Sequence, residues 1–241
     1  HIDNFKTFSI GFDTSEYDES DEAAFVADYF GTDHTQLTVD PSTPDLLPRI
    51  VSTFGEPIAD PAVLPTLLLA ERAREDVKVV QTGEGADERF GGYWYYNRIG
   101  RHRELTRRVP SWIFSAFKPI ASRSAVKPRH LRYLSSLGSD ADAIEVAATD
   151  FRETPESYLA TGSHGDLSSL ILDSFSWADS EYRHRHLTFD LQYSLPSNLL
   201  AKVDYATMQA SLEARTPFLD HELVEFTHQI PTDQRFDGTY K

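Results

Sequence analysis

Three acidic side chains, Glu84, Asp87 and Glu88, fall within five consecutive residues. Carboxylates this close would repel one another, and would repel a phosphate, unless a divalent cation or another positive group lay among them. Gly83 and Gly85 flank Glu84 and allow the backbone to turn sharply there. The pattern therefore predicts a site for a magnesium-bound nucleotide.

A buried strand is expected to deliver this turn. The apolar residues 77–80 (VKVV) predict a strand of an α/β sheet, and open sheets bind ligands at the carboxyl ends of their strands. Two common nucleotide-binding motifs do not fit this stretch. The dinucleotide fingerprint requires a glycine where Glu88 stands, and no G-x-x-x-x-G-K-[ST] occurs in the chain. A different loop must hold the phosphates.

Residues 82–93 (TGEGADERFGGY) resemble the S-G-E-G-[AS]-D-E-x-F-G-G-Y signature of the synthetase domain of glutamine-hydrolysing asparagine synthetases, a family of PP-loop ATP pyrophosphatases. Other family motifs follow the expected order. The segments of this chain that resemble them are, with the family motif in parentheses, 8–12 (second sheet strand), 31–34 (L-G-T-x-H), 56–61 (E-P-x-x-D-P), 199–204 (L-L-x-K-x-D) and 211–220 (S-x-E-x-R-x-P-F-L-D). Several motifs in one order are far more specific than any single motif.

The first 98 residues alternate strand-like and helix-like patterns, which is typical of β-α units and a parallel sheet. The patterns predict strands over 6–12, 35–39 and 77–81, and helices over 21–30, 45–54 and 63–74, the first helix ending at Gly31. No convincing strand follows residue 99. Together with the resemblance, this predicts an α/β fold, a parallel sheet of the adenine-nucleotide α-hydrolase (PP-loop) type followed by a mainly helical region. Residues 1–98 would form the nucleotide-binding part, and 99–241 the helical part of the same synthetase domain.

The resemblance places Glu84 near the substrate carboxylate and the incoming ammonia, where it could orient ammonia or accept a proton. Its alternative role is that of a carboxylate favoured at a helix start. Asp87 and Glu88 are implied as magnesium ligands on the pyrophosphate side. Glu88 equally suits a structural pair with an arginine.

Five further residues are implied to contact ligands. Ile10 would lie beside adenine, and Thr82 and Gly83 would contact the nucleotide by hydroxyl or backbone groups. Asp60 and Tyr93 would line the substrate pocket. Without the resemblance, Ile10 is a plain core residue, and Tyr93 begins an aromatic run that suits a core.

Late in the chain, Lys202, Asp204 and Arg215 match charged motif positions, where salt bridges would fix helices beneath the site. Two departures from the family pattern occur. Tyr205 stands where the family has arginine, and Arg89 stands where it has an aliphatic residue. They affect the expected local packing and exact substrate more than the fold.

The composition is strongly acidic, with 38 Asp and Glu against 23 Lys and Arg and a net charge of −15. This balance, with lysine scarce beside arginine, argues against nonspecific nucleic-acid binding and suits a cytosol of high ionic strength. It points to a halophile, a haloarchaeal one by our interpretation, and an acidic mesophilic enzyme is the alternative. There is no cysteine and no apolar run of about 18 residues that could span a membrane, so a cytoplasmic protein is expected. Residues 98–132 hold ten basic residues and one acid, and either dock an acidic neighbour or form a solvated face.

The chain starts at His1 and its one methionine is Met208, which predicts a fragment. By resemblance, the S-G-G-x-D-S pyrophosphate loop and the glutaminase domain would lie upstream, and the K-x-G-F segment downstream. We therefore expect the 241 residues alone to be inactive.

The implied reaction of the parent enzyme is ATP- and Mg²⁺-dependent amidation of aspartate through β-aspartyl-AMP, with ammonia from glutamine. The glutaminase domain of the parent chain is the expected partner, and a homodimer is a further candidate. Two alternatives stay open: a related β-lactam or macrolactam synthetase, and a non-catalytic paralogue that binds only a nucleotide or a partner.

Overall fold

The structure is a computed structural model of the 241-residue chain. It describes residues 5–12, 18–39, 47–55, 60–93, 96, 113 and 187–235. The basic stretch 98–132 lies outside these residues except for Ile113, as does most of the region predicted to be helical. That prediction is therefore tested only from residue 187 onward.

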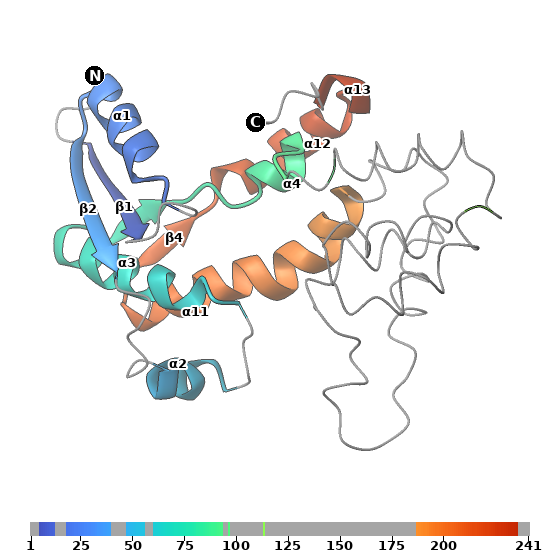
Figure 1. The fold of residues 1–241 in the computed structure, drawn as a ribbon. Helices are drawn as coiled ribbons and strands as arrows, with labels where there is room; N and C mark the ends of the chain where they lie inside the picture. Colours follow the sequence, from blue (N-terminus) through green and yellow to red (C-terminus); the bar gives the residue numbers. More distant parts are fainter. Residues whose placement is uncertain are drawn as a thin grey trace, which may run out of the picture. The chain divides into compact units, whose positions relative to one another are not determined.

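The first half begins with a strand, a helix and a second strand (Figure 1). Strands β1 (Lys6–Phe12) and β2 (Asp33–Val39) pair in parallel, with Lys6 opposite Asp33 and Phe12 opposite Val39. Helix α1 (Ser20–Phe30) joins them. It ends at Gly31, whose φ of 65° is the left-handed conformation that glycine adopts most readily. The predicted strands and the helix end are confirmed, with β2 starting two residues earlier.

Two helices of the first half and one from late in the chain build an apolar core together. Helices α2 (Leu47–Phe54) and α3 (Val63–Asp76) follow β2, and α11 (Leu200–Gln209) packs against α3 (Figure 1). The buried side chains that meet are Ile50, Phe54, Val63, Leu67 and Ala206. The predicted helices near 45–54 and 63–74 are thus confirmed, and the late motif of α11 is found to close the core that they share.

One prediction about the second half is wrong. Strand β4 (Glu213–Arg215) pairs in parallel with β3 (Val79–Gln81), Val79 lying opposite Glu213 and Gln81 opposite Arg215. The sequence patterns predict no convincing strand beyond residue 99. The Glu-Ala-Arg segment of β4 has neither β-branched nor aromatic residues, so nothing local favours a strand there. Strand formation here depends on the neighbouring β3 and on burial of the preceding Leu212, which is 2% exposed, rather than on local propensity.

The remaining elements are helical. They are α4 (Ala86–Phe90), the π-helix η3 (Asp190–Leu199), the short 3₁₀ helix η4 (Pro217–Leu219), α12 (His221–His228) and α13 (Thr232–Arg235). Pro196 lies inside η3, where its missing N–H cannot donate to the helical hydrogen-bond ladder; such a position suits a widened turn better than a regular α-helix.

The chain divides into two compact units. The first comprises residues 1–85 and 193–220, and the second comprises residues 86–192 and 221–241. The described parts form a mixed α/β structure with two small parallel sheets, whereas the PP-loop sheet type and a domain boundary at residue 98 stay predictions. None of the helices in the described ranges is long and apolar enough to cross a membrane.

Candidate functional site

The first part of the signature continues the pairing of β3 with β4. The Thr82 N–H donates to the Arg215 carbonyl at 2.9 Å, one step beyond the last strand pair. Gly85 then adopts a φ of 89°, and a Cβ at this position would meet the side chain of Leu219. The turn therefore requires glycine at 85 for both conformation and space. Sequence reasoning missed Leu219, because its contact with the turn joins segments far apart in the chain.

Three predicted nucleotide contacts lie in the same unit as this turn. Ile10 is half-buried on β1, opposite Leu37 of β2. Gly83 is exposed, and a Cβ added there would have no atom within 4 Å. The Thr82 hydroxyl oxygen is buried without a hydrogen-bond partner among the described residues. A buried hydroxyl in this condition is a group that a bound ligand could satisfy.

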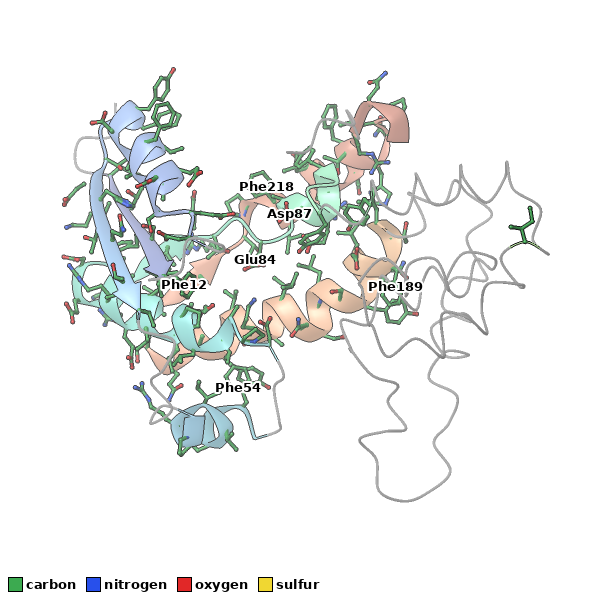
Figure 2. All side chains as sticks on the ribbon, viewed as in Figure 1. Phe12, Phe54, Glu84, Asp87, Phe189 and Phe218 are labelled. Carbon is green, nitrogen blue, oxygen red and sulfur yellow. The ribbon has the colours of Figure 1, made fainter. Side chains whose placement is uncertain are left out.

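Glu84 lies on the loop between β3 and α4 and is half-buried (Figure 2). It takes part in an interaction within the protein. Glu84 therefore lies on the turn after the strand, as the sequence predicted, while its role toward ammonia stays a prediction.

Asp87 lies in the first turn of α4, at the start of the second unit (Figure 2). Its carbonyl accepts the N–H groups of Gly91 at 2.8 Å and Gly92 at 3.0 Å, which closes the end of this short helix. A Cβ at position 92 would collide with the Asp87 carboxylate. Although the residue as a whole is exposed, partial burial raises the pKa of its carboxyl group.

Glu88 follows Asp87 on α4 but is buried where Asp87 is exposed, because adjacent helical residues project about 100° apart and meet different surroundings. Glu88 is 1% exposed, and its Oε1 accepts a hydrogen bond from the Tyr93 hydroxyl at 2.6 Å. The structure thus brings together two predicted site residues, Glu88 and Tyr93. Tyr93 in turn contacts the buried Tyr96, with ring centroids 5.7 Å apart.

Arg89, one of the departures from the family pattern, is buried at 5% exposure. It donates through Nη1 toward the Val224 carbonyl at 3.4 Å and His228 Nδ1 at 3.2 Å, both on α12. Burial lowers the pKa of its guanidinium, the positive charge of Arg235 adds to this effect, and Glu88 opposes it. Arg89 therefore anchors α4 to α12, a role that an aliphatic side chain could not perform.

Asp60, predicted to bind substrate, has protein partners on both carboxylate oxygens. Oδ1 accepts the Ala62 N–H at 2.8 Å near the start of α3, and Oδ2 accepts Lys202 Nζ at 3.0 Å. The predicted salt bridge of Lys202 is thereby confirmed, with a partner that sequence reasoning had assigned to a different role. Arg215 pairs with Glu213 in an exposed bridge of 2.8 Å.

The sequence profile of the asparagine synthase family matches residues 2–241. The chain belongs to this family. It is 31% identical over 250 residues to asparagine synthetase [glutamine-hydrolyzing] 1 of Bacillus subtilis, which covers 99% of this chain and 38% of that protein. A provisionally named glutamine-hydrolysing asparagine synthetase of Mycobacterium tuberculosis is 30% identical over 247 residues, covering 99% of this chain and 37% of that protein.

A more distant relative carries a different name. Amidase chry2 of Gibberella zeae is 26% identical over 257 residues, which cover 95% of this chain and 37% of that protein. The chain therefore spans less than two-fifths of the length of each of these relatives. Family membership confirms the resemblance that the signature and its companion motifs indicated.

Proposed function

We propose that this chain is the synthetase part of a glutamine-hydrolysing asparagine synthetase, an ATP-dependent carbon–nitrogen ligase. The observation that carries the proposal is the match of the asparagine synthase family to residues 2–241. The names of the Bacillus and Mycobacterium relatives support the same activity.

In the proposed reaction, an aspartate β-carboxylate oxygen attacks the α-phosphorus of ATP, giving β-aspartyl-AMP and releasing pyrophosphate. Ammonia, supplied by a glutaminase domain, then attacks the acyl carbon and displaces AMP to form asparagine. Glu84 would orient the ammonia and accept the proton that it loses. Exclusion of water would protect the acyl-adenylate from hydrolysis.

Ile10, Thr82 and Gly83 would hold the nucleotide. The buried Thr82 hydroxyl supports this, because a nucleotide oxygen would satisfy a group that has no partner among the described residues. The open space around Gly83 supports a close approach to its backbone. Tyr93 would line the acceptor pocket, held in place by its hydrogen bond to Glu88.

The described residues contain no group of three potential metal-ligating side chains. Magnesium commonly binds through one or two carboxylates together with substrate phosphates and water, so Asp87 fits this role with ATP present. Glu88 is the second ligand that the sequence predicts, although its Oε1 is bonded to Tyr93. When bound, the ion would neutralise charge on the pyrophosphate.

The proposal extends to the architecture and the setting. The sheet would be of the PP-loop type, with the nucleotide-binding part over residues 1–98 and the helical part over 99–241. The enzyme would work in the cytoplasm.

Aspartate-dependent exchange of pyrophosphate into ATP tests the proposal in the natural full-length protein. We expect exchange in the wild type and a loss on the order of 100-fold or more in Asp87→Ala. Glu84→Ala should reduce asparagine formation more than exchange, because Glu84 is assigned to the ammonia step. Glu225→Ala, which removes an exposed carboxylate of α12, is the control and should retain exchange.

Exchange with another carboxylate but not with aspartate would favour a lactam-forming enzyme. Absence of exchange with any carboxylate would favour a binding-only paralogue. Either result would refute the assignment as asparagine synthetase.

A further inference from the structure

We infer that Asp60 is a positioning residue: paired with Lys202, it fixes α11 to the start of α3 and thereby holds residues 82–85, the signature turn, in place. The inference rests on the proposed function for its kinetic consequences. Its structural part, the coupling of the pair to the turn at Thr82, stands independently of the reaction. It gives Asp60 a different role from the substrate contact that the sequence suggested.

The hydrogen bonds of Asp60 are made within the protein. Oδ1 accepts the Ala62 N–H at 2.8 Å, while Oδ2 accepts Lys202 Nζ at 3.0 Å and Asn198 Nδ2 at 3.3 Å. The side chains of Asp60 and Lys202 are 14% and 8% exposed. A carboxylate with three donors and little access to solvent has scant capacity left for a substrate.

Two of the three donors, Asn198 and Lys202, share the Oδ2 atom of Asp60. Asn198 and Lys202 are four residues apart, about one helical turn, so both can reach the same carboxylate oxygen. Next to them, Ala206 of α11 packs with Val63 and Leu67 of α3 in one buried cluster. The ion pair and the apolar cluster therefore hold the same two helices together.

The chain after α11 leads to the signature turn. Leu212 is buried directly before β4, and the β4 residue Arg215 accepts the Thr82 N–H at 2.9 Å. Four residues later Leu219 packs against Gly85. A displacement of α11 would therefore shift β4 and η4, which support the two ends of the turn that carries Glu84.

The test compares Asp60→Asn, Lys202→Met and the double variant in the natural full-length protein. Removing one partner of a buried pair leaves the other uncompensated, whereas the double variant leaves neither charge. We expect each single variant to lower kcat for aspartate-dependent exchange on the order of 10- to 100-fold, with KM for aspartate changed less than about twofold. The double variant should be no worse than either single variant, and Lys202→Arg should retain most of the wild-type rate.

Hydrogen exchange provides a readout that does not depend on the reaction. We expect the Thr82 amide hydrogen to exchange at least about tenfold faster in Asp60→Asn and in Lys202→Met, because its acceptor Arg215 is displaced. The matched control is Asp33→Asn, which removes a carboxylate from an exposed bridge with Lys6 in the same unit. It should leave Thr82 unchanged.

Two results would overturn the inference. One is a tenfold or larger rise in KM for aspartate in Asp60→Asn while Lys202→Met behaves as wild type, since this identifies a substrate contact. The other is unchanged Thr82 exchange in the folded variants. If a single variant does not fold, the double variant is used instead. With both charges removed, its Thr82 amide should still exchange hydrogen faster than in the wild type. A Thr82 amide as protected as in the wild type refutes the coupling. If the wild type shows no aspartate-dependent pyrophosphate exchange, but the variants show the expected faster hydrogen exchange at Thr82, only the proposed function is refuted.

Discussion

Asp87 lies where burial disfavours the charged form of its carboxyl group. Partial burial raises the pKa of its carboxyl group, while the backbone around it folds back through Gly91 and Gly92. Carboxyl groups whose surroundings disfavour the charged form are common at sites that bind a cation or substrate. Glu88, its neighbour in sequence, instead has the Tyr93 hydroxyl as a donor.

The sign of this effect can be measured with Asp87→Asn. Because the pKa is raised in the folded state, the wild type is destabilised at pH values above that pKa, and the destabilisation disappears as pH falls below the unfolded value of about 3.9. We expect Asp87→Asn to be more stable than wild type in urea unfolding at pH 7, with the difference shrinking toward pH 3.5. Glu225→Gln on α12 is the control and should show no such trend. A variant less stable than wild type at pH 7 would contradict this account.

At the scale of elements, the signature turn depends on a strand and a 3₁₀ helix from the late part of the chain. β4 pairs with β3 before the turn, and η4 places Leu219 against Gly85 within it. The start of the signature, residues 82–85, and the late motif at residues 211–220 therefore belong to the same structural unit. This explains why the late segment carries so many residues of the family pattern without carrying the predicted chemistry.

Substitution at the two glycines of the turn separates conformation from space. Gly85→Ala should destabilise the chain by about 1–3 kcal/mol, because φ is positive there and the new methyl group meets Leu219. Gly83→Ala is the matched control and should change stability by less than about 0.5 kcal/mol, since no atom lies within 4 Å of its Cβ.

Adding Leu219→Ala to Gly85→Ala distinguishes the two causes. The pair should cost less than the sum of the single changes, because the contact is relieved while the positive φ remains. Urea unfolding of the four variants measures these differences. Strict additivity would mean that Leu219 does not crowd position 85.

At the scale of the whole molecule, the net charge of −15 is the dominant feature. Like charges spread over a folded surface repel one another more strongly in the compact state than in the expanded unfolded chain. Salt shortens the distance over which these charges act on one another, from about 30 Å at 0.01 M to about 3 Å at 1 M. The prediction of a halophilic origin rests on this charge and the scarcity of lysine.

Potassium chloride should therefore raise the free energy of unfolding of the chain. We expect the steepest gain below about 0.2 M, where screening changes most, and we expect sucrose at matched osmolality to lack that early rise. Unfolding in urea across a salt series measures this. A flat response below 0.2 M with a gain only at molar salt would point to general salting-out rather than charge screening.

The sequence by itself determined the family, the extents of β1, α1 and the helices around the first core, and the turn after β3. Local patterns decide these features, since apolar spacing and a helix-ending glycine act over a few residues. Ordered motifs such as that at residues 82–93 likewise need no structure to be recognised.

Only the tertiary structure decided which distant residues meet. Asp60 and Lys202 lie 142 residues apart, and nothing local to either identifies the other as its partner. Burial also separated Asp87 from Glu88, and left Phe25 and Tyr29 of α1 at 71% and 75% exposure despite their apolar character. Such outcomes depend on which elements pack together, and packing is a property of the folded chain rather than of any short segment.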